Sequence, residues 1–421
     1  MREEQIAGSA PVDIAIVGAG AAGLATAIFT RRISPSRSVA LLDGAARPGA
    51  KILISGGSRC NVTNASVSER DFCGGKATII RRVLRAFSVA QTVDWFGSLG
   101  VSLHEEPHGK LFPDSNRSRD VLDALLREAH ASGVDLQAGT RVNGVDRVGD
   151  RFRLETSRGP LEATVVVLAT GGQSLPKTGS DGLGLEIARR LGHTIVPTTP
   201  ALVPLTAADD ERLHKPLTGV ALDVALSIWV DGRVARRIGG SLLWTHFGVS
   251  GPAVLDASRH WLRAHLEQRD AWITVSFSPG ESFDQLDARW ASLAQSRPRA
   301  SVQTVLAAML PASAAAAILL HLGVDSSLSL AHLDRPLRRR LSHALVEWPL
   351  AVSGSRGYNY AEATAGGVAL DEIDPATMAS RRCAGLYLVG EMLDVDGRIG
   401  GFNFQWAWSS ARAAARSLGR E

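Results

Sequence analysis

The feature that most constrains this chain is an apolar segment, residues 14–17, that runs directly into the glycine pattern Gly18-Ala-Gly-Ala-Ala-Gly23. The apolar segment predicts a strand, and the alanine-rich residues after the glycines predict a helix that begins near Ala21. In such a unit Gly18 permits a tight turn, Gly20 lets a pyrophosphate approach the backbone, and Gly23 lets the helix pack on the strand. The N–H groups at the start of the helix then face the phosphates.

An acidic residue, Asp43, follows Gly23 by 20 residues and ends a second apolar segment, residues 38–43. In a strand–helix–strand unit of this kind, a carboxylate at that place binds the ribose hydroxyls of an adenosine. Six spaced residues alone would be weak evidence in a chain of 421 residues with 42 glycines. Together with the flanking strands and the acid, they predict a dinucleotide-binding site.

Composition excludes several other classes of protein. The formal net charge is +4, the charges are scattered, and 5% of the residues are aromatic, a pattern that does not favour nucleic-acid binding. The cysteines Cys60, Cys73 and Cys383 form no Cys-x-x-Cys pair, which argues against a dithiol reductase and is typical of a reducing cytoplasm. Metal-ligand spacings are also missing from the sequence, so we expect no metal.

Residues 301–324 must be considered as a candidate transmembrane helix, because they contain no Asp, Glu, Lys or Arg. Pro311 and several Ser and Gly residues interrupt it, which favours a soluble helical segment. The N-terminal residues 1–10 are polar and lack the apolar core of a signal peptide. We therefore expect a cytoplasmic protein with a small-molecule substrate, without nucleic acid or membrane; the sequence does not indicate an oligomeric state.

The order of predicted elements indicates one domain interrupted by another. Two uninterrupted apolar runs, residues 163–169 and 385–390, predict strands buried on both faces of one parallel sheet. Between them lie alternating segments typical of an antiparallel barrel or sandwich, and then a region that predicts helices. We therefore expect a discontinuous dinucleotide-binding domain of residues 1–193 and 358–421, an inserted β domain of residues 194–282 and 347–357, and a helical domain of residues 283–346.

Polar, glycine-rich segments predict the rest of the site. The loop after Asp43 contains small residues together with the donors Lys51, Arg59, Asn61 and Asn64. Cys60 in this loop is more typical of a packing thiol than of a nucleophile. A second small-residue segment, residues 170–172, ends the apolar run of residues 163–169, where the backbone of a parallel sheet meets a cofactor.

The C-terminal segment favours FAD over NAD. Glu391 and Asp396 follow the apolar run of residues 385–390, where a carboxylate suits the ribityl hydroxyls of FAD. Gly400 and Gly401 then open a helix, whose positive end can stabilise a reduced isoalloxazine ring. An NAD-dependent dehydrogenase has no need of this element and is the less favoured alternative.

In the inserted region, residues 244–252 form the densest motif of polar residues and glycines. Its His246 could donate a proton or orient a substrate. A lone histidine is also common as a hydrogen-bonded loop residue. Both interpretations stay open for His246.

These segments together resemble the HI0933-like flavoproteins, also known as the BaiN/RdsA or aminoacetone-oxidase-type NAD(P)/FAD-dependent oxidoreductases. The resemblance rests on residues 18–23, 55–64, 109–115, 169–184, 245–252 and 390–405. It implies an α/β fold, with a glutathione-reductase-type FAD-binding Rossmann-like domain, an inserted β-barrel-like domain and a small helical domain. The chain departs from the family pattern at Asp43, where glutamate is common, and at Ser58, where glycine is usual.

The resemblance implies tightly bound FAD, held by Gly18, Gly20, Gly23, Asp43, Lys51, Arg59, Asn61, Gly172, Glu391, Asp396, Asn403 and Gln405. Neighbouring loop residues complete the predicted cofactor site: Ala21, Ala22, Ser55, Gly56, Gly57, Cys60, Asn64, Thr170, Gly171, Gly390, Gly400, Gly401 and Phe402.

We therefore expect an FAD-dependent oxidoreductase that transfers a hydride between flavin N5 and a small organic substrate. The chain has one convincing dinucleotide fingerprint, so we expect NAD(P)H to bind transiently as reductant. Two alternatives stay open. One is oxidation of a small amine with oxygen as acceptor, and the other is a flavin-containing RNA-associated or redox-sensing binding protein.

Overall fold

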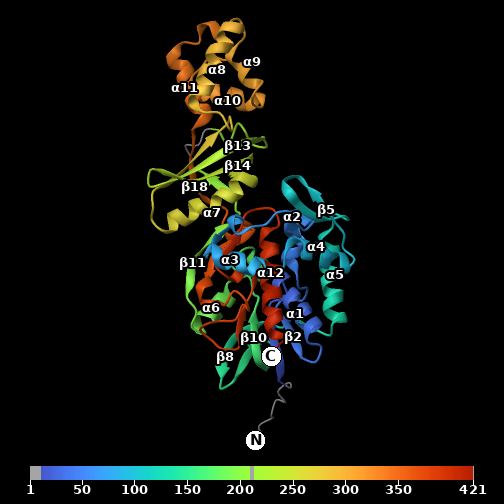
Figure 1. The fold of residues 1–421 in the computed structure, drawn as a ribbon. Helices are drawn as coiled ribbons and strands as arrows, with labels where there is room; N and C mark the ends of the chain where they lie inside the picture. The colour runs from blue at the N-terminus through green and yellow to red at the C-terminus, as the bar shows by residue number, and fades with distance from the viewer. Residues whose placement is uncertain (1–10, 209–212, 421) are drawn as a thin grey trace. The chain divides into compact units, whose positions relative to one another are not determined.

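The computed structural model describes residues 11–208 and 213–420, so the polar segment of residues 1–10 lies outside the described residues (Figure 1). The chain divides into two compact units. Unit 1 extends to Thr198 and resumes at Glu362, and unit 2 comprises residues 199–361. In this division the predicted β and helical domains share unit 2, and their separation stays a prediction.

Unit 1 contains a seven-stranded sheet with the order β7-β2-β1-β10-β9-β8, in which β20 also pairs with β10. Five strands are parallel: β1 (Val12–Val17), β2 (Val39–Asp43), β7 (Asp135–Ala138), β10 (Gly159–Leu168) and β20 (Leu386–Leu388). In the register, Val17 lies opposite both Leu42 and Leu168, so the ends of β1, β2 and β10 meet at one edge of the sheet. The antiparallel strands β9 (Arg151–Thr156) and β8 (Val142–Val148) extend the sheet beyond β10.

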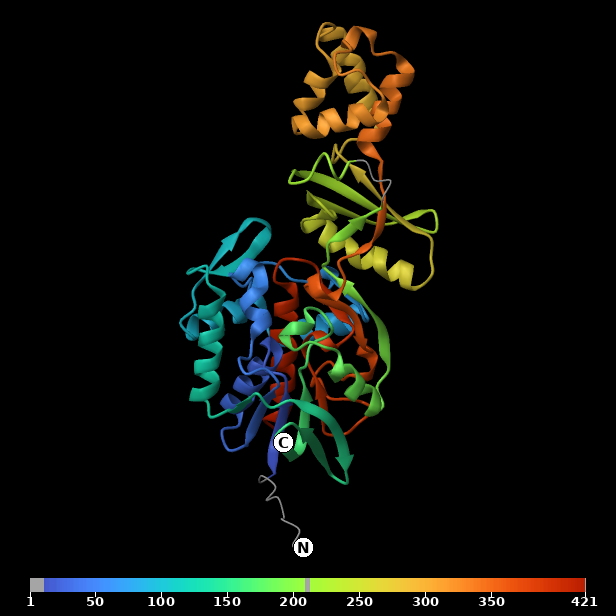
Figure 2. The same ribbon diagram turned by 180° about the vertical axis from the view of Figure 1, so that it is seen from behind.

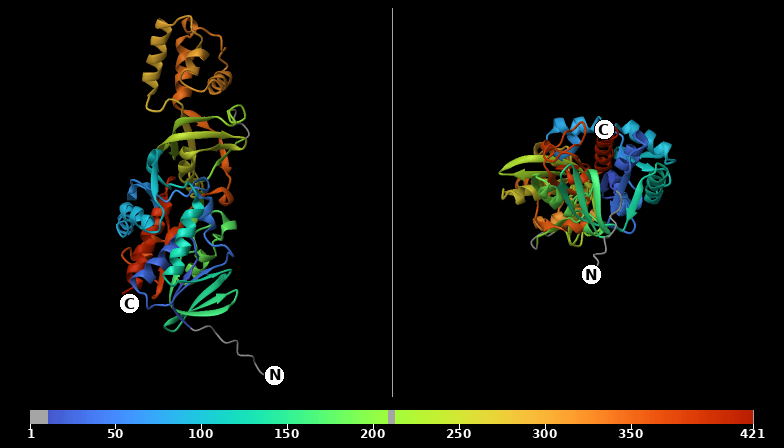
Figure 3. Two further views of the ribbon diagram at one scale, coloured as in Figure 1. Left: turned by 90° about the vertical axis from the view of Figure 1, so that its right-hand side faces the viewer. Right: turned by 90° about the horizontal axis from the view of Figure 1, so that it is seen from below.

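Two helices from opposite ends of the chain pack together in unit 1. Helix α1 (Ala21–Ile33) follows β1, and α12 (Phe402–Leu418) lies along it, as both views of Figure 3 show. Helix α12 buries residues all round its circumference, because alanines and serines such as Ser409, Ser410 and Ala414 let neighbours approach closely.

The remaining elements of unit 1 surround this core. They are α2 (Ala50–Ser58), β3 (Thr63–Asn64), β4 (Phe72–Gly74), α3 (Ala77–Leu84), α4 (Val89–Ser98), β5 (Leu103–Glu106), β6 (Lys110–Pro113), α5 (Ser118–Ala131), α6 (Leu183–Arg190), β19 (Ala363–Val368) and β21 (Val395–Gly397). Strand β11 (Ile195–Ala201) begins in unit 1, and its last three residues are counted in unit 2.

Unit 2 contains a seven-stranded antiparallel sheet with the order β17-β16-β13-β14-β15-β12-β18 (Figure 2). Its strands are β12 (Leu205–Ala207), β13 (Ala221–Val230), β14 (Arg233–Thr245), β15 (Gly248–Ser250), β16 (Ala271–Ser276), β17 (Trp348–Leu350) and β18 (Val352–Ser355). The two edge strands β17 and β18 are consecutive in the chain, so the sheet curls towards a barrel. Helix α7 (Pro252–Leu266) packs on the sheet through Ala253, Ala257, Trp261 and Ala264, at helical spacing.

Four helices complete unit 2: α8 (Phe283–Ser296), α9 (Val302–Ala307), α10 (Ala312–Leu322) and α11 (Arg335–Val346). Ser282 and Gln285 form a capping box at the start of α8, and Asp334 caps α11. The uncharged stretch of residues 301–324 forms α9 and α10, with Pro311 between them. Across residues 11–208 and 213–420, every helix is too short or too polar to span a membrane.

A buried network in unit 1 links a glutamate, a histidine and a serine, as in a catalytic triad, but its role is structural. His193 Nδ1 lies 2.9 Å from Glu372 Oε2, and its Nε2 lies 2.7 Å from Ser380 Oγ. Ser380 Oγ also accepts backbone hydrogen bonds from Arg382 at 3.0 Å and from Cys383 at 2.9 Å. Both lone pairs of this hydroxyl are therefore engaged, so it holds a turn and is not free to act as a nucleophile.

We expect this network to make unit 1 sensitive to acid. Burial opposes the charged form of Glu372, but hydrogen bonds from Thr194, Arg382 and His193 outweigh it and lower its pKa from 4.5 to about 2. Burial also lowers the pKa of His193 from 6.5. Each shift makes the unfolded chain bind more protons than the folded chain as the pH falls.

The free energy of unfolding should therefore fall below about pH 6.5 and more steeply between about pH 4.5 and pH 2. Loss of the Glu372 contribution over the lower window amounts to about 3 kcal/mol. Denaturant titrations across this range check the slope. In Glu372→Gln the slope should flatten, and an undiminished slope in that variant would contradict the assignment.

Candidate functional site

The three glycines of the first turn have different steric surroundings. A Cβ on Gly18, whose φ is 102°, would lie 2.6 Å from the carbonyl oxygen of Ala169. A Cβ on Gly23 would lie 1.8 Å from the carbonyl oxygen of Gly18. A Cβ on Gly20 would meet no heavy atom of the described residues within 4 Å. Gly18 and Gly23 are therefore required by the packing of the chain, whereas Gly20 borders space that the described chain leaves open.

The start of α1 suits an anion. Gly20 is the N-cap residue, no described side chain caps the helix, and its first turn contains no acidic residue. The first N–H groups of a helix lack partners within the helix and carry the positive end of its dipole. This terminus and the open space beside Gly20 together fit a pyrophosphate.

Asp43 connects the end of β2 to the glycine turn. Its Oδ2 accepts a hydrogen bond from the backbone N–H of Ala19 at 2.7 Å, and its Oδ1 accepts one from Ala45 at 2.8 Å. These bonds fix the orientation of the carboxylate. Each oxygen keeps a second lone pair with which it can accept a ribose hydroxyl.

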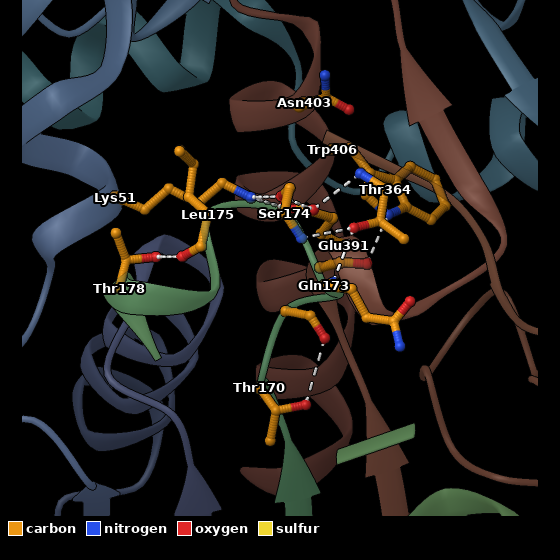
Figure 4. A network of polar contacts seen from close by, with 12 residues as sticks. Lys51, Thr170, Gln173, Ser174, Leu175, Thr178, Thr364, Glu391, Asn403 and Trp406 are labelled. Carbon is orange, nitrogen blue, oxygen red and sulfur yellow. Dashed lines mark hydrogen bonds and ion pairs between the residues drawn. The ribbon is translucent and has the colours of Figure 1, made fainter. Parts of the chain in front are cut away.

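Four segments that are distant in sequence meet in one polar network (Figure 4). Lys51 extends from α2 towards Ser174, with its Nζ 2.5 Å from Ser174 Oγ, and forms an ion pair with Glu391. Ser174 Oγ donates to Glu391 Oε1 at 2.7 Å. Glu391 Oε1 also accepts a hydrogen bond from the backbone N–H of Thr364 at 3.0 Å. Thr364 Oγ1 in turn accepts the backbone N–H groups of Gln173 and Ser174, at 2.8 and 3.0 Å.

Sequence reasoning identified Lys51 and Glu391 but missed Ser174 and Thr364. Thr364 is a fully buried hydroxyl in the otherwise apolar or glycine strand β19, and that pattern was a usable signal. A Cβ on Gly172 would lie 2.4 Å from Thr364 Oγ1, and a Cβ on Gly171 would lie 2.8 Å from Ser180 Oγ. The small residues that end β10 are therefore required by these hydroxyls.

The loop that ends α2 is held in the left-handed region. Gly56, Gly57 and Ser58 have φ values of 55°, 68° and 66°, and Cys60 has φ 64°. This conformation explains why glycine is usual at position 58 in the family pattern. Burial raises the pKa of the Cys60 thiol to about 12, against an opposing hydrogen bond with Ser55, so Cys60 packs as a neutral thiol.

The donors of this loop have different environments. Asn61 is 7% exposed, and its Oδ1 is buried with no hydrogen-bond partner among the described residues. A buried acceptor of this kind is unfavourable unless a ligand or water supplies a donor. Arg59 forms an ion pair with Glu106, and its guanidinium lies 4.0 Å from the centroid of the Phe112 ring.

The side-chain amides of Asn64, Asn403 and Gln405 bind the protein itself. Asn64 Nδ2 donates to the carbonyl oxygens of His108 and Gly400, at 3.0 and 3.1 Å. Asn403 exchanges two hydrogen bonds with the backbone of Gly397.

Gln405 Oε1 accepts from the hydroxyls of Thr63 and Thr92, and its Nε2 donates to Phe87 O and Ser409 Oγ. All four hydrogen-bonding positions of the Gln405 amide are therefore used within unit 1. Gln405 supports the start of α12 and keeps no group for a ligand.

The rest of the predicted C-terminal site is packed tightly. Asp396 is 1% exposed on β21, which pairs with β4. Phe402 is 1% exposed at the start of α12. A Cβ on Gly401 would lie 2.4 Å from Thr63 O, and a Cβ on Gly390 would lie 2.7 Å from the Cβ of Ala22.

The predicted catalytic residue belongs to the other unit. His246 lies exposed in the turn between β14 and β15 of unit 2. Its ring centroid is 5.1 Å from that of Phe247, in an edge-on arrangement. A role for His246 stays a prediction.

Unit 1 therefore has the parallel sheet, the glycine turn and the acidic residue at the end of β2 that are typical of a Rossmann-type dinucleotide-binding protein. The chain belongs to the HI0933-like family: the model described as HI0933-like protein Rossmann domain matches residues 12–417. The predicted family and fold class are thus confirmed.

Two relatives match almost over their full lengths. The chain is 34% identical over 413 residues to the ribosomal RNA dihydrouridine synthase of Escherichia coli, covering 96% of this chain and 98% of that protein. It is 30% identical over 404 residues to the 3-dehydro-bile acid delta(4,6)-reductase of Clostridium scindens, again covering 96% of this chain and 98% of that protein. A point mutant of E. coli quinol fumarate reductase FrdA has a similar fold, with a TM-score of 0.51 at 14% identity over 98% of this chain and 70% of that one.

Proposed function

We propose that this chain is an FAD-dependent oxidoreductase that holds FAD in unit 1. The observation that carries the proposal is the open space beside Gly20 at the uncapped start of α1, next to the oriented carboxylate of Asp43. This combination suits the pyrophosphate and the adenosine ribose of a dinucleotide. When bound, FAD would supply hydride transfer at its isoalloxazine ring.

Two further residues of unit 1 keep groups that can bind the cofactor. The unpartnered Asn61 Oδ1 can accept a hydrogen bond from a ligand. Lys51 Nζ has three N–H donors, of which Ser174 and Glu391 take two, so one is left to donate to a ligand. The ion pair with Glu391 restricts the orientation of the Lys51 side chain.

The activities for which the two relatives are named indicate a class of reaction. Conversion of uridine to dihydrouridine reduces a carbon–carbon double bond that is conjugated with a carbonyl, and reduction of a 3-dehydro bile acid at positions 4 and 6 does the same. We therefore propose that this chain reduces such a conjugated double bond, with NAD(P)H as reductant. The relatives named here do not favour the amine-oxidase alternative.

The substrate that we propose is uridine in ribosomal RNA, because the similarity to the E. coli dihydrouridine synthase is the higher of the two. This proposal departs from the sequence-based expectation of a small molecule without nucleic acid. It agrees with the expected cytoplasmic location, where ribosomal RNA is found.

Spectroscopy and mass spectrometry test the proposal. Purified protein should be yellow and should bleach when it is mixed anaerobically with NADH or NADPH. Ribosomal RNA treated with the reduced protein should then contain a nucleoside that is two hydrogen atoms heavier than uridine. A 3-oxo steroid with a conjugated double bond tests the small-molecule alternative. Bleaching by an amine instead, or a colourless protein that FAD cannot reconstitute, would refute the proposal.

We also propose that His246 donates a proton during turnover, because it is an exposed imidazole in the densest motif of polar residues and glycines of the inserted region. His246→Ala should lower kcat by about 100-fold, the usual contribution of general acid catalysis. The flavin content should stay the same, and His246→Gln should be equally slow. Steady-state kinetics across pH check this, and an unchanged kcat in both variants would remove His246 from the mechanism.

A further inference from the structure

We propose that Arg356, together with Phe247 and Tyr360, forms a phosphate-binding clamp in unit 2. The proposal rests on the proposed function only in the choice of phosphate ligands. The guanidinium carbon of Arg356 lies 3.7 Å from the centroid of the Tyr360 ring and 4.4 Å from that of the Phe247 ring. Cation–π contacts with two rings restrict the rotation of this long side chain.

The backbone around the clamp is held by three neighbouring strands. Arg356 directly follows β18, and its backbone N–H donates to Pro204 O at 3.0 Å, just before β12. Phe247 directly precedes β15, and its carbonyl oxygen accepts the N–H of Ala207 at 3.0 Å. Strands β15 and β12 approach each other closely beside Phe247, because a Cβ on Gly248 would lie 2.4 Å from Leu205 O. The glycine-rich motif of residues 244–252 thus positions the Phe247 ring.

Within the described part of the chain, the hydrogen-bonding groups of the Arg356 guanidinium have no acceptor. Among residues 11–208 and 213–420, no side chain or carbonyl accepts a hydrogen bond from the Arg356 side chain, and no carboxylate pairs with it. Other arginines of unit 2 do have carboxylate partners: Arg269 pairs with Asp231, Arg289 with Glu281 and Arg338 with Asp287.

The guanidinium of Arg356 has its N–H groups in one plane, as a fork, and its contacts with the two rings use none of the described hydrogen-bond acceptors. This fork matches two oxygens of a phosphate or carboxylate. The preorganised side chain loses little further entropy when it binds.

Two phosphate-containing molecules enter the proposed reaction. One is the RNA backbone, and the other is NAD(P)H. The geometry in unit 2 suits the phosphate oxygens that they share. The test therefore measures the two ligands separately.

The experiment compares Arg356→Ala and Arg356→Lys with the control Arg289→Ala, which removes an exposed, ion-paired arginine of the same unit. Binding is measured without turnover, by fluorescence anisotropy with a uridine-containing oligoribonucleotide and by calorimetry with NADPH. We expect one of the two ligands to bind about 10- to 100-fold more weakly to both Arg356 variants, because lysine keeps the charge but loses the fork. The control should bind both ligands like the wild type.

Two further readouts separate a binding role from a structural one. If the ligand is RNA, the slope of log affinity against log salt concentration should fall by about one in Arg356→Ala. Millimolar guanidinium should partly restore binding to Arg356→Ala. Unchanged affinity for both ligands in folded Arg356→Lys would overturn the clamp, and so would an equal loss in Arg289→Ala. Because these assays need no turnover, failure of the proposed reductase activity would not be mistaken for failure of the clamp.

Discussion

Gly23→Ala will strongly destabilise unit 1, whereas Gly20→Ala will leave it folded but will weaken its binding of FAD. A Cβ at position 23 would lie 1.8 Å from the carbonyl oxygen of Gly18, which is backbone that cannot rotate away. Overpacking against backbone should lower the free energy of unfolding by about 3 kcal/mol or more. Thermal and urea-induced unfolding measure this loss.

The Gly20 variant separates folding from ligand binding. Gly20 has φ −81° and ψ −167°, a conformation that alanine adopts readily, and a Cβ there meets no described atom within 4 Å. The free energy of unfolding without flavin should therefore change by less than about 1 kcal/mol. The added methyl group would occupy the space in which we place the pyrophosphate, so the affinity for FAD should fall by at least about 10-fold.

The comparison can fail in two ways. Normal flavin retention in Gly20→Ala would show that this space does not hold the pyrophosphate. Normal stability in Gly23→Ala would show that the turn and α1 can separate without loss. The two variants change the same chemical group three positions apart, so they serve as controls for each other.

Glu391→Ala is the second change with a large expected effect. It leaves the Lys51 ammonium without its carboxylate and removes the acceptor for Ser174 Oγ and the Thr364 N–H. The side chains of Lys51 and Glu391 are 26% and 17% exposed, so the lost interactions are only partly screened by water. We expect a loss of about 2–3 kcal/mol in the free energy of unfolding, together with loss of FAD.

Matched variants locate the cause. Glu391→Gln keeps the shape and an acceptor for the Thr364 N–H but loses the charge, so its effect should be smaller. Glu128→Gln breaks the surface ion pair with Arg32 and should change stability by less than about 1 kcal/mol. A double-mutant cycle of Glu391→Gln with Lys51→Met measures the coupling directly. If Glu391→Ala is as mild as Glu128→Gln, the network does not hold the site together.

Much of unit 1 was predictable because the relevant signals are local. The strand, the turn and the start of α1 follow from signals within residues 12–33, which include the close contact of Gly23 with the carbonyl oxygen of Gly18. The close contact of Gly18 with Ala169, in contrast, is long-range. The run of residues 163–169 belongs to β10, which starts earlier, at Gly159, because the antiparallel neighbour β9 extends it. The run of residues 385–390 yields only Leu386–Leu388 as strand, because Gly390 turns the chain with φ 75°.

The predicted ligand contacts were harder to assign. Gln405 sits in a motif that resembles a cofactor-binding segment, but Thr63, Thr92 and Phe87 saturate its amide. These partners lie more than 300 positions away in the chain. Sequence alone shows that an amide is present at such a position, and the partners decide whether it faces a ligand or the protein.

The sequence by itself determined the Rossmann-type turn, the placement of Asp43 after β2 and the membership of the HI0933-like family, because spacing and backbone sterics act over a few residues. Only the tertiary structure decided that Lys51, Ser174, Thr364 and Glu391 form one network, and that Arg356 lies over Phe247 and Tyr360. Such groupings depend on strand order and register, which bring together segments whose side chains carry no local mark of their partners.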